Sequence, residues 1–235
     1  MNITRIMAIA EKDVKEFMRN MALLTMPILP ILLGVFYGKL GDKEPMPDKI
    51  ATAMVVLILA VTFSSVCTSG MMTMLAEENE KGTLRGLINS PASMIDILLG
   101  KSIVVIFFTI ISIIGSMWMM HPNVSINYRW IVGGVLFMLF FLLIGTALGL
   151  HVKTVASTSV YLLPILFIFA MSPMMDTFGL DKDNKFLKLA HYLPGNQYVE
   201  YINEKQMSHL FILIIWVVIA FILTVYYFNK SKQDY

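Results

Sequence analysis

Residues 76–101 read AEENEKGTLRGLINSPASMIDILLGK, and this polar stretch separates two long apolar runs. It opens with three glutamates, breaks at Ser90-Pro91 and returns to apolar sequence near Met94. It is the longest charged interruption in the first two-thirds of the chain. Because proline ends a helix and turns the chain, the pattern predicts a short polar helix over residues 76–94, exposed to water between two membrane spans.

The composition is that of a membrane protein. Of the 235 residues, 57% are hydrophobic and only 14% are charged, with a mean hydropathy of +0.72. Soluble domains are about one quarter charged. A formal net charge of +2 does not favour a nucleic-acid partner. The single cysteine, Cys67, excludes a disulfide within the chain.

The apolar runs predict an all-α, multi-pass membrane protein with six transmembrane helices, because about 20 apolar residues cross a bilayer. We expect these spans over residues 21–37, 50–75, 97–120, 130–150, 160–175 and 210–228. Pro27 and Pro30 predict a break in the first span. We interpret residues 1–235 as a single transmembrane domain. Its parts are an interfacial helix (1–20), spans one and two (21–75), a polar helix (76–94), spans three to five (95–175), an outer re-entrant segment (176–209) and span six (210–229).

Residues 3–18 form an amphipathic pattern rather than a span. Apolar residues recur at the i, i+3, i+4, i+7 spacing of one helical face, and charged residues occupy the rest. Such a helix lies in the headgroup region, with its basic residues toward the lipid phosphates. A helix packed against another subunit is the alternative.

The segment before the last span is too apolar for a free loop. Pro194-Gly195-Asn196 predicts two short helices that dip into the outer membrane surface, where irregular backbone must be buried in protein. We predict an outer gate here; a folded loop without a gating role is the alternative. The candidate gate residues are Phe186, Leu189, Tyr192, Pro194 and Tyr198.

Two of the spans are rich in small or polar residues. Gly145 and Gly149, four residues apart in span four, predict close helix packing. The second half of span two carries five candidates for lining a substrate pathway, four of them on one helical face: Thr62, Ser65, Thr68, Ser69 and Met72. Helix packing is an equally good interpretation of these five.

The sequence has neither a complete phosphate-binding loop nor a zinc-enzyme motif. Gly100-Lys101-Ser102 resembles the end of a phosphate-binding loop, but position 95, where that loop needs glycine, is isoleucine. No HExxH zinc motif occurs, so we predict neither a metal site nor catalytic residues. We expect no ionisable residue deep inside a span, which disfavours ion-coupled transport. The energy for any transport then comes from elsewhere.

Six spans place both termini on one side of the membrane. With the N-terminus inside, ten lysines and arginines lie inside and eight outside. This bias, with the amphipathic N-terminus, predicts cytoplasmic termini.

The central polar stretch, with its Glu80-Lys81-Gly82-Thr83-Leu84, Ser90-Pro91 and Leu99-Gly100-Lys101, resembles the permease subunits of ABC-2 type transporters. The predicted architecture is similar along nearly the whole chain. In that family the helix after span two is a coupling helix that docks on a cytosolic ATPase. The resemblance implies ATPase contacts at Glu77, Glu78, Glu80, Lys81, Gly82, Thr83, Leu84, Arg85 and Leu87. We also expect the glutamates to lie near a helix start, where the helix dipole favours them.

The resemblance implies a bacterial plasma-membrane exporter that works by alternating access. Its partners would be two copies of an ABC ATPase, which bind ATP and Mg²⁺, a second permease half in a homo- or heterodimer, and membrane lipid. A peptide toxin or antimicrobial peptide is the first candidate substrate, and a drug the second. The alternatives are a non-transporting scaffold or sensor subunit, and an ATP-independent secondary transporter.

Overall fold

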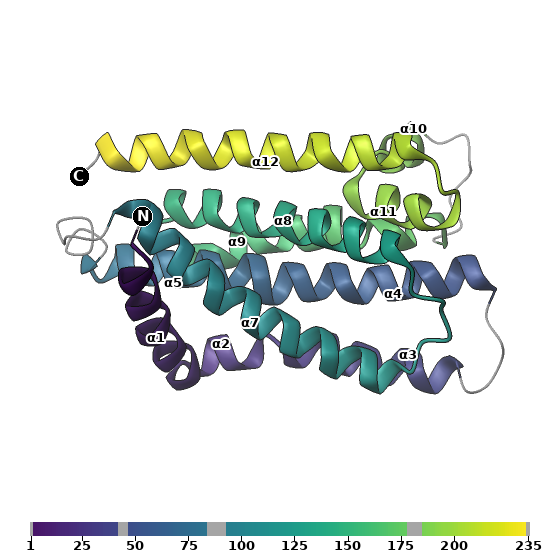
Figure 1. The fold of residues 1–235 in the computed structure, drawn as a ribbon, viewed down its shortest axis with the longest axis horizontal. Helices are drawn as coiled ribbons and strands as arrows, with labels where there is room; N and C mark the ends of the chain where they lie inside the picture. Colours follow the sequence, from purple (N-terminus) through teal and green to yellow (C-terminus); the bar gives the residue numbers. More distant parts are fainter. Residues whose placement is uncertain (1, 42–46, 84–92, 178–184, 234–235) are drawn as a thin grey trace.

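The computed structural model describes residues 2–41, 47–83, 93–177 and 185–233, and over them its regular secondary structure is helical, joined by short connections such as residues 121–127. Helices run lengthwise side by side, and both termini lie at one end of the bundle (Figure 1). We call this end the inner end and the opposite one the outer end. The elements are α1 (Ile3–Arg19), α2 (Met21–Thr25), α3 (Ile28–Gly41), α4 (Asp48–Thr62), η1 (Phe63–Thr68), α5 (Ser69–Glu80), α7 (Met94–Met120), α8 (Tyr128–His151), α9 (Val155–Ile165), η2 (Leu166–Ala170), η3 (Ser172–Thr177), α10 (Lys185–Ala190), α11 (Pro194–Asn203) and α12 (Met207–Gln233).

Five helical stretches in the described part of the chain are long and apolar enough to cross a membrane. They are Met21–Leu40, Asp48–Glu80, Met94–Met120, Tyr128–His151 and Met207–Ser231. The predicted fifth span corresponds to Val155–Ala170, a shorter apolar helix that contains Pro164. The multi-pass helical architecture is confirmed, and the count of six spans stays a prediction.

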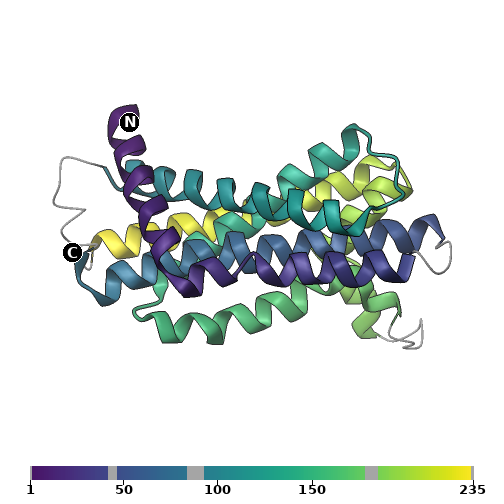
Figure 2. The ribbon, with the colours of Figure 1, turned by 90° about the horizontal axis from the view of Figure 1, so that it is seen from below.

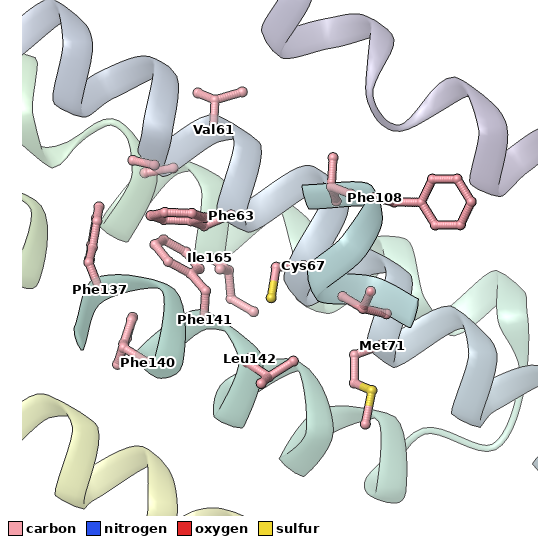
Figure 3. Close-up of a cluster of buried hydrophobic side chains, with 14 of the residues drawn as sticks. Val61, Phe63, Cys67, Met71, Phe108, Phe137, Phe140, Phe141, Leu142 and Ile165 are labelled. Carbon is pink, nitrogen blue, oxygen red and sulfur yellow. The ribbon is translucent and has the colours of Figure 1, made fainter. Parts of the chain in front are cut away.

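The stretch Asp48–Glu80 is the central helix of the bundle, since 83% of its apolar window is buried. Phe63 of this stretch packs against Phe137 and Phe141 of α8, with ring centroids 5.7 and 6.2 Å apart (Figure 3). The predicted role of Gly145 and Gly149 in close packing is confirmed. A Cβ atom on Gly145 would lie 2.8 Å from the backbone of Thr68.

The middle of the central helix, η1, is a π-helix. A π-turn contains an extra residue, so side chains beyond it shift around the helix axis relative to a regular α-helix. The predicted face that holds four of the five pathway candidates, Ser65, Thr68, Ser69 and Met72, assumed the α-helical period and therefore does not hold across this turn.

The two prolines of the first span differ in effect. Pro27 lies in a turn between α2 and α3, which confirms the predicted break, whereas Pro30 lies within α3. Most of this span is exposed on the surface of the bundle.

The segment before α12 contains two short helices, α10 and α11, as predicted. The break falls at residues 191–193, just before Pro194, rather than at Pro194-Gly195-Asn196. Pro194 is the first residue of α11, where its fixed φ suits the helix and its missing N–H costs no hydrogen bond.

Candidate functional site: the inner end of the central helix

The first glutamates of the polar stretch belong to the end of a helix and not to the start of one. α5 runs without interruption to Glu80, so Glu77 and Glu78 occupy its last turn. The predicted stabilisation of these carboxylates by a helix N-terminus is therefore wrong, because a C-terminus carries the negative end of the dipole. Lysine side chains, described below, compensate this charge instead.

Glu78 lies at a buried junction of three helices. Its Oε1 is 2.9 Å from Nζ of Lys101 in α7 and 2.8 Å from Nζ of Lys12 in α1. Lys101 also lies 3.2 Å from Oδ2 of Asp13 in α1. Asp13, Glu78 and Lys101 are 0%, 3% and 1% exposed, respectively. We call Lys12, Asp13, Glu78 and Lys101 the inner junction.

The inner junction is balanced in charge, with two carboxylates facing two ammonium groups. Burial alone would lower the pKa of Lys12, but its hydrogen bond to Glu78 and the carboxylate charges outweigh burial and raise this pKa. Removing one member of a buried ion pair leaves the other as an uncompensated buried charge. The junction therefore fixes the tip of α5 against α1 and α7.

Sequence reasoning missed the pairing of Lys101 with Asp13. The sequence does contain a pattern that indicates a buried Asp13. This residue lies on the stripe of α1 that faces the bundle, together with Ile6, Ile9, Ala10 and Phe17. A carboxylate on an apolar stripe needs a buried cation as its partner. α1 can approach Lys101 closely because Gly100 leaves room for Ile9.

A helix is present at the N-terminus as predicted, namely α1 (Figure 2), and one stripe of it is buried against the bundle; its place in the headgroup region stays a prediction. Its lysines make ion pairs within the chain: Lys12 joins the inner junction, and Lys15 lies 2.6 Å from Glu11. Contact of its basic residues with lipid phosphates stays a prediction.

Further contacts tie the end of α5 to its neighbours. Glu77 pairs with Lys81 and accepts a hydrogen bond from Asn20, which links α1 to α2. Glu80 accepts a hydrogen bond of 2.8 Å from the backbone N–H of Val155, at the start of α9. The three glutamates predicted to contact an ATPase thus make contacts within the chain, and an ATPase contact stays a prediction for them.

An exposed segment follows directly after this anchored tip. Lys81, Gly82 and Thr83 are exposed, and Gly82 adopts a left-handed conformation with φ of 67°. Among the described residues, no atom beyond the two chain neighbours lies within 4 Å of the position that a Cβ on Gly82 would take. The remaining predicted contact residues, Leu84, Arg85 and Leu87, lie outside the described residues.

The candidate pathway residues are packed inside the chain. Thr68 donates a hydrogen bond of 2.8 Å to the carbonyl oxygen of Phe141 in α8, and Thr62 donates one to its own helix. All five candidates, Thr62, Ser65, Thr68, Ser69 and Met72, are buried. These contacts are those expected from the packing interpretation, and a lining role stays a prediction.

The candidate gate residues divide into two groups. Leu189 and Tyr192 are exposed, whereas Pro194 and Tyr198 are buried. Tyr198 donates a hydrogen bond of 2.7 Å to the carbonyl oxygen of Trp130, so it anchors α11 on α8. The side chain of Phe186 is not among those described.

The fold and this junction define a multi-pass helical membrane protein whose central span has an anchored polar tip. The family model described as ABC-2 family transporter protein matches residues 37–226. The chain therefore belongs to the ABC-2 family of transporter proteins. Comparison with curated protein sequences gives no match. The family comprises the non-catalytic membrane components of transporters, which generally work with an ABC ATPase.

Proposed function

We propose that this chain is the permease subunit of an ATP-driven exporter, and that the exposed segment after α5 receives movement from a separate ATPase. The observation that carries this proposal is the exposed Lys81–Gly82–Thr83 segment at the tip of the central helix. Glu77, Glu78 and Glu80 hold that tip from within, and the predicted contact surface continues into Leu84, Arg85 and Leu87. ATP and Mg²⁺ would bind to two copies of the ATPase.

The central helix is well suited to carry such a movement. Asp48–Glu80 contains 33 residues, and at 1.5 Å per residue it extends for about 50 Å. Its inner tip is linked to α1 and α7 by the inner junction. A displacement of the tip would therefore move three helices together, which supports alternation between inward- and outward-facing packings.

The exposed apolar surface supports a second permease half and an apolar or amphipathic cargo. α3 exposes Leu32 and Phe36, and α12 exposes Phe211, Ile215 and Phe221. A homo- or heterodimer would cover part of this surface and form a pathway between the halves. A peptide or a drug would suit such a pathway, in a bacterial plasma membrane with both termini in the cytoplasm.

A second candidate, the ATP-independent secondary transporter, gains support from the same junction. Asp13, Glu78 and Lys101 are buried ionisable groups, which sequence reasoning did not expect. Each is paired, however, and an ion-paired group suits a structural role. A non-transporting scaffold is the third candidate.

Isolation from native membranes separates these candidates. We expect a soluble ATPase to accompany the tagged chain and to be lost when residues 77–84 are scrambled. Recovery of the folded chain alone would favour the secondary transporter. Recovery with a cytosolic partner whose ATP turnover never responds to the chain would favour the scaffold.

Substitution of Gly82 tests the contact surface directly. In the described part of the chain, no atom beyond the neighbouring residues lies within 4 Å of a Cβ on Gly82, so Gly82→Trp adds bulk toward a docking partner. The positive φ strains any L side chain there, which the control must share. Gly82→Asn is the matched control, because it too places an L side chain at this positive φ, but a small one. We expect Gly82→Trp to lower ATP-dependent transport about tenfold or more, since 1.4 kcal/mol of lost docking energy is a factor of ten. Equal transport by both variants would contradict the coupling role.

A further inference from the structure

A cavity of about 590 Å³ opens at the inner end of the bundle, away from the inner junction. It lies between the tip of α5, the turn from α8 to α9 and the last turns of α12. The residues that line it are Asn79, Leu150, His151, Lys153, Tyr227, Lys230 and Ser231. The proposed transport function assigns no role to this cavity.

The described residues of the cavity wall carry positive charge only. Lys153 and Lys230 line the cavity together with His151, and none of the described lining residues is acidic. Neither lysine makes an ion pair within the described part of the chain. The carboxylate of Glu80, also at the tip of α5, accepts its hydrogen bond from the backbone of Val155.

A larger cavity at the same end of the bundle lacks this excess of positive charge. That cavity, of about 960 Å³, is lined by Lys12, Lys15, Arg19 and Lys81, but also by Glu11, Glu16 and Glu77. Its lysines pair with carboxylates at or near its wall. The smaller cavity therefore attracts an anion, whereas the larger one is close to neutral.

The other lining groups suit a phosphate. The hydroxyl groups of Tyr227 and Ser231 can donate hydrogen bonds to its oxygens. The ring of Tyr227 packs against that of His151, with centroids 4.9 Å apart, and this contact orders the wall. Lysine ammonium groups bind phosphate as point charges.

The surroundings favour a phosphate attached to a lipid. Ile222 and Tyr226 precede Lys230 by eight and four residues, so they form an exposed apolar stripe of α12 that leads to the cavity. Basic pockets between membrane helices near the cytoplasmic surface bind anionic lipid headgroups, with the acyl chains along the apolar helix surface. We propose that this cavity binds the phosphate-bearing headgroup of an anionic phospholipid.

The test measures binding of dioleoyl phosphatidylglycerol to the purified full chain in a neutral detergent, by native mass spectrometry. Dioleoyl phosphatidylcholine and inorganic phosphate are the comparison ligands. The test variant is the double substitution Lys153→Gln and Lys230→Gln. The matched control is Lys15→Gln and Arg19→Gln, which removes two positive charges at the same end but outside the cavity.

Each basic residue near an anionic headgroup strengthens binding about fivefold, so the test variant should bind phosphatidylglycerol about 25-fold more weakly. We expect the control to bind it almost as well as the native chain, and phosphatidylcholine to bind weakly to all three. Equal weakening in both doubles would show general charge attraction and overturn the site. Displacement of the lipid by millimolar inorganic phosphate would overturn the lipid assignment in favour of a free phosphate.

Discussion

The two ends of the molecule bury carboxylates in different ways. At the inner end, Asp13 and Glu78 face the ammonium group of Lys101. At the outer end, the buried Glu200 of α11 faces the imidazoles of His191 and His209. The inner carboxylates are thus compensated by lysine, and the outer one faces histidine. Burial raises the pKa of Glu200, so the charge of this outer carboxylate changes with the pH.

The outer contacts form a chain of groups from several elements. Nε2 of His191 lies 3.1 Å from Oε2 of Glu200, and Nδ1 of His209 lies 3.4 Å from the same oxygen. The other ring nitrogen of His209 lies 3.2 Å from Oε2 of Glu204. Burial raises the pKa of Glu200, and the charge of Glu204 adds to this effect, while His191, His209 and Lys49 of α4 oppose it.

Of the substitutions that test the difference between the two ends, one at Lys101 should lower the stability of the folded chain most. Lys101→Met leaves Asp13 and Glu78 buried, and only Lys12 remains to compensate them. We expect a loss of about 3–5 kcal/mol of stability, the usual cost of removing one partner from a buried pair. Thermal unfolding of the purified chain in detergent measures this loss.

Lys15→Met is the matched control for this change. Lys15 pairs with Glu11 on the exposed side of α1, and exposed pairs contribute about 0–1 kcal/mol. Equal destabilisation by the two variants would mean that the inner junction does not hold the inner end together.

Local patterns in the sequence predicted the elements well. The spacing of apolar residues identified α1, and Pro27 predicted the break before α3. These features depend on residues within about one helical turn of each other, so the sequence displays them directly. The predicted end of span two at residue 75 falls five residues short of the end of α5 at Glu80.

The sequence could not predict which charged groups meet. Lys101 and Asp13 are 88 positions apart, and their contact depends on how α1 crosses α7. The sequence also could not predict which side chains share a face beyond η1, because the α-helical period holds only where no π-turn intervenes.

A smaller effect is expected at the outer end, for Tyr198. Tyr198→Phe keeps the ring packed against Trp130 and Phe137 but removes the hydrogen bond to the carbonyl oxygen of Trp130. A buried hydrogen bond contributes about 1 kcal/mol. Thermal unfolding should show a loss of this size, with Tyr192→Phe, an exposed tyrosine of the same segment, as the control. A loss as large as that of Lys101→Met would remove the contrast between the ends.

The smallest effect, and the one that distinguishes the ends most directly, is the pH dependence at Glu200. Because burial raises the pKa of Glu200 in the folded chain, the folded state holds this proton more tightly than the unfolded state. Its stabilising contribution is therefore complete below the unfolded pKa of about 4.3 and is lost as the pH rises through the folded pKa. Glu200→Gln cannot lose a proton, so it should abolish this fall while leaving stability at low pH little changed. Unfolding temperatures of the native chain and the variant, measured from pH 4 to pH 8, test this expectation. Parallel curves for the two proteins would show that Glu200 does not set the pH response, and the outer cluster would then resemble the inner junction.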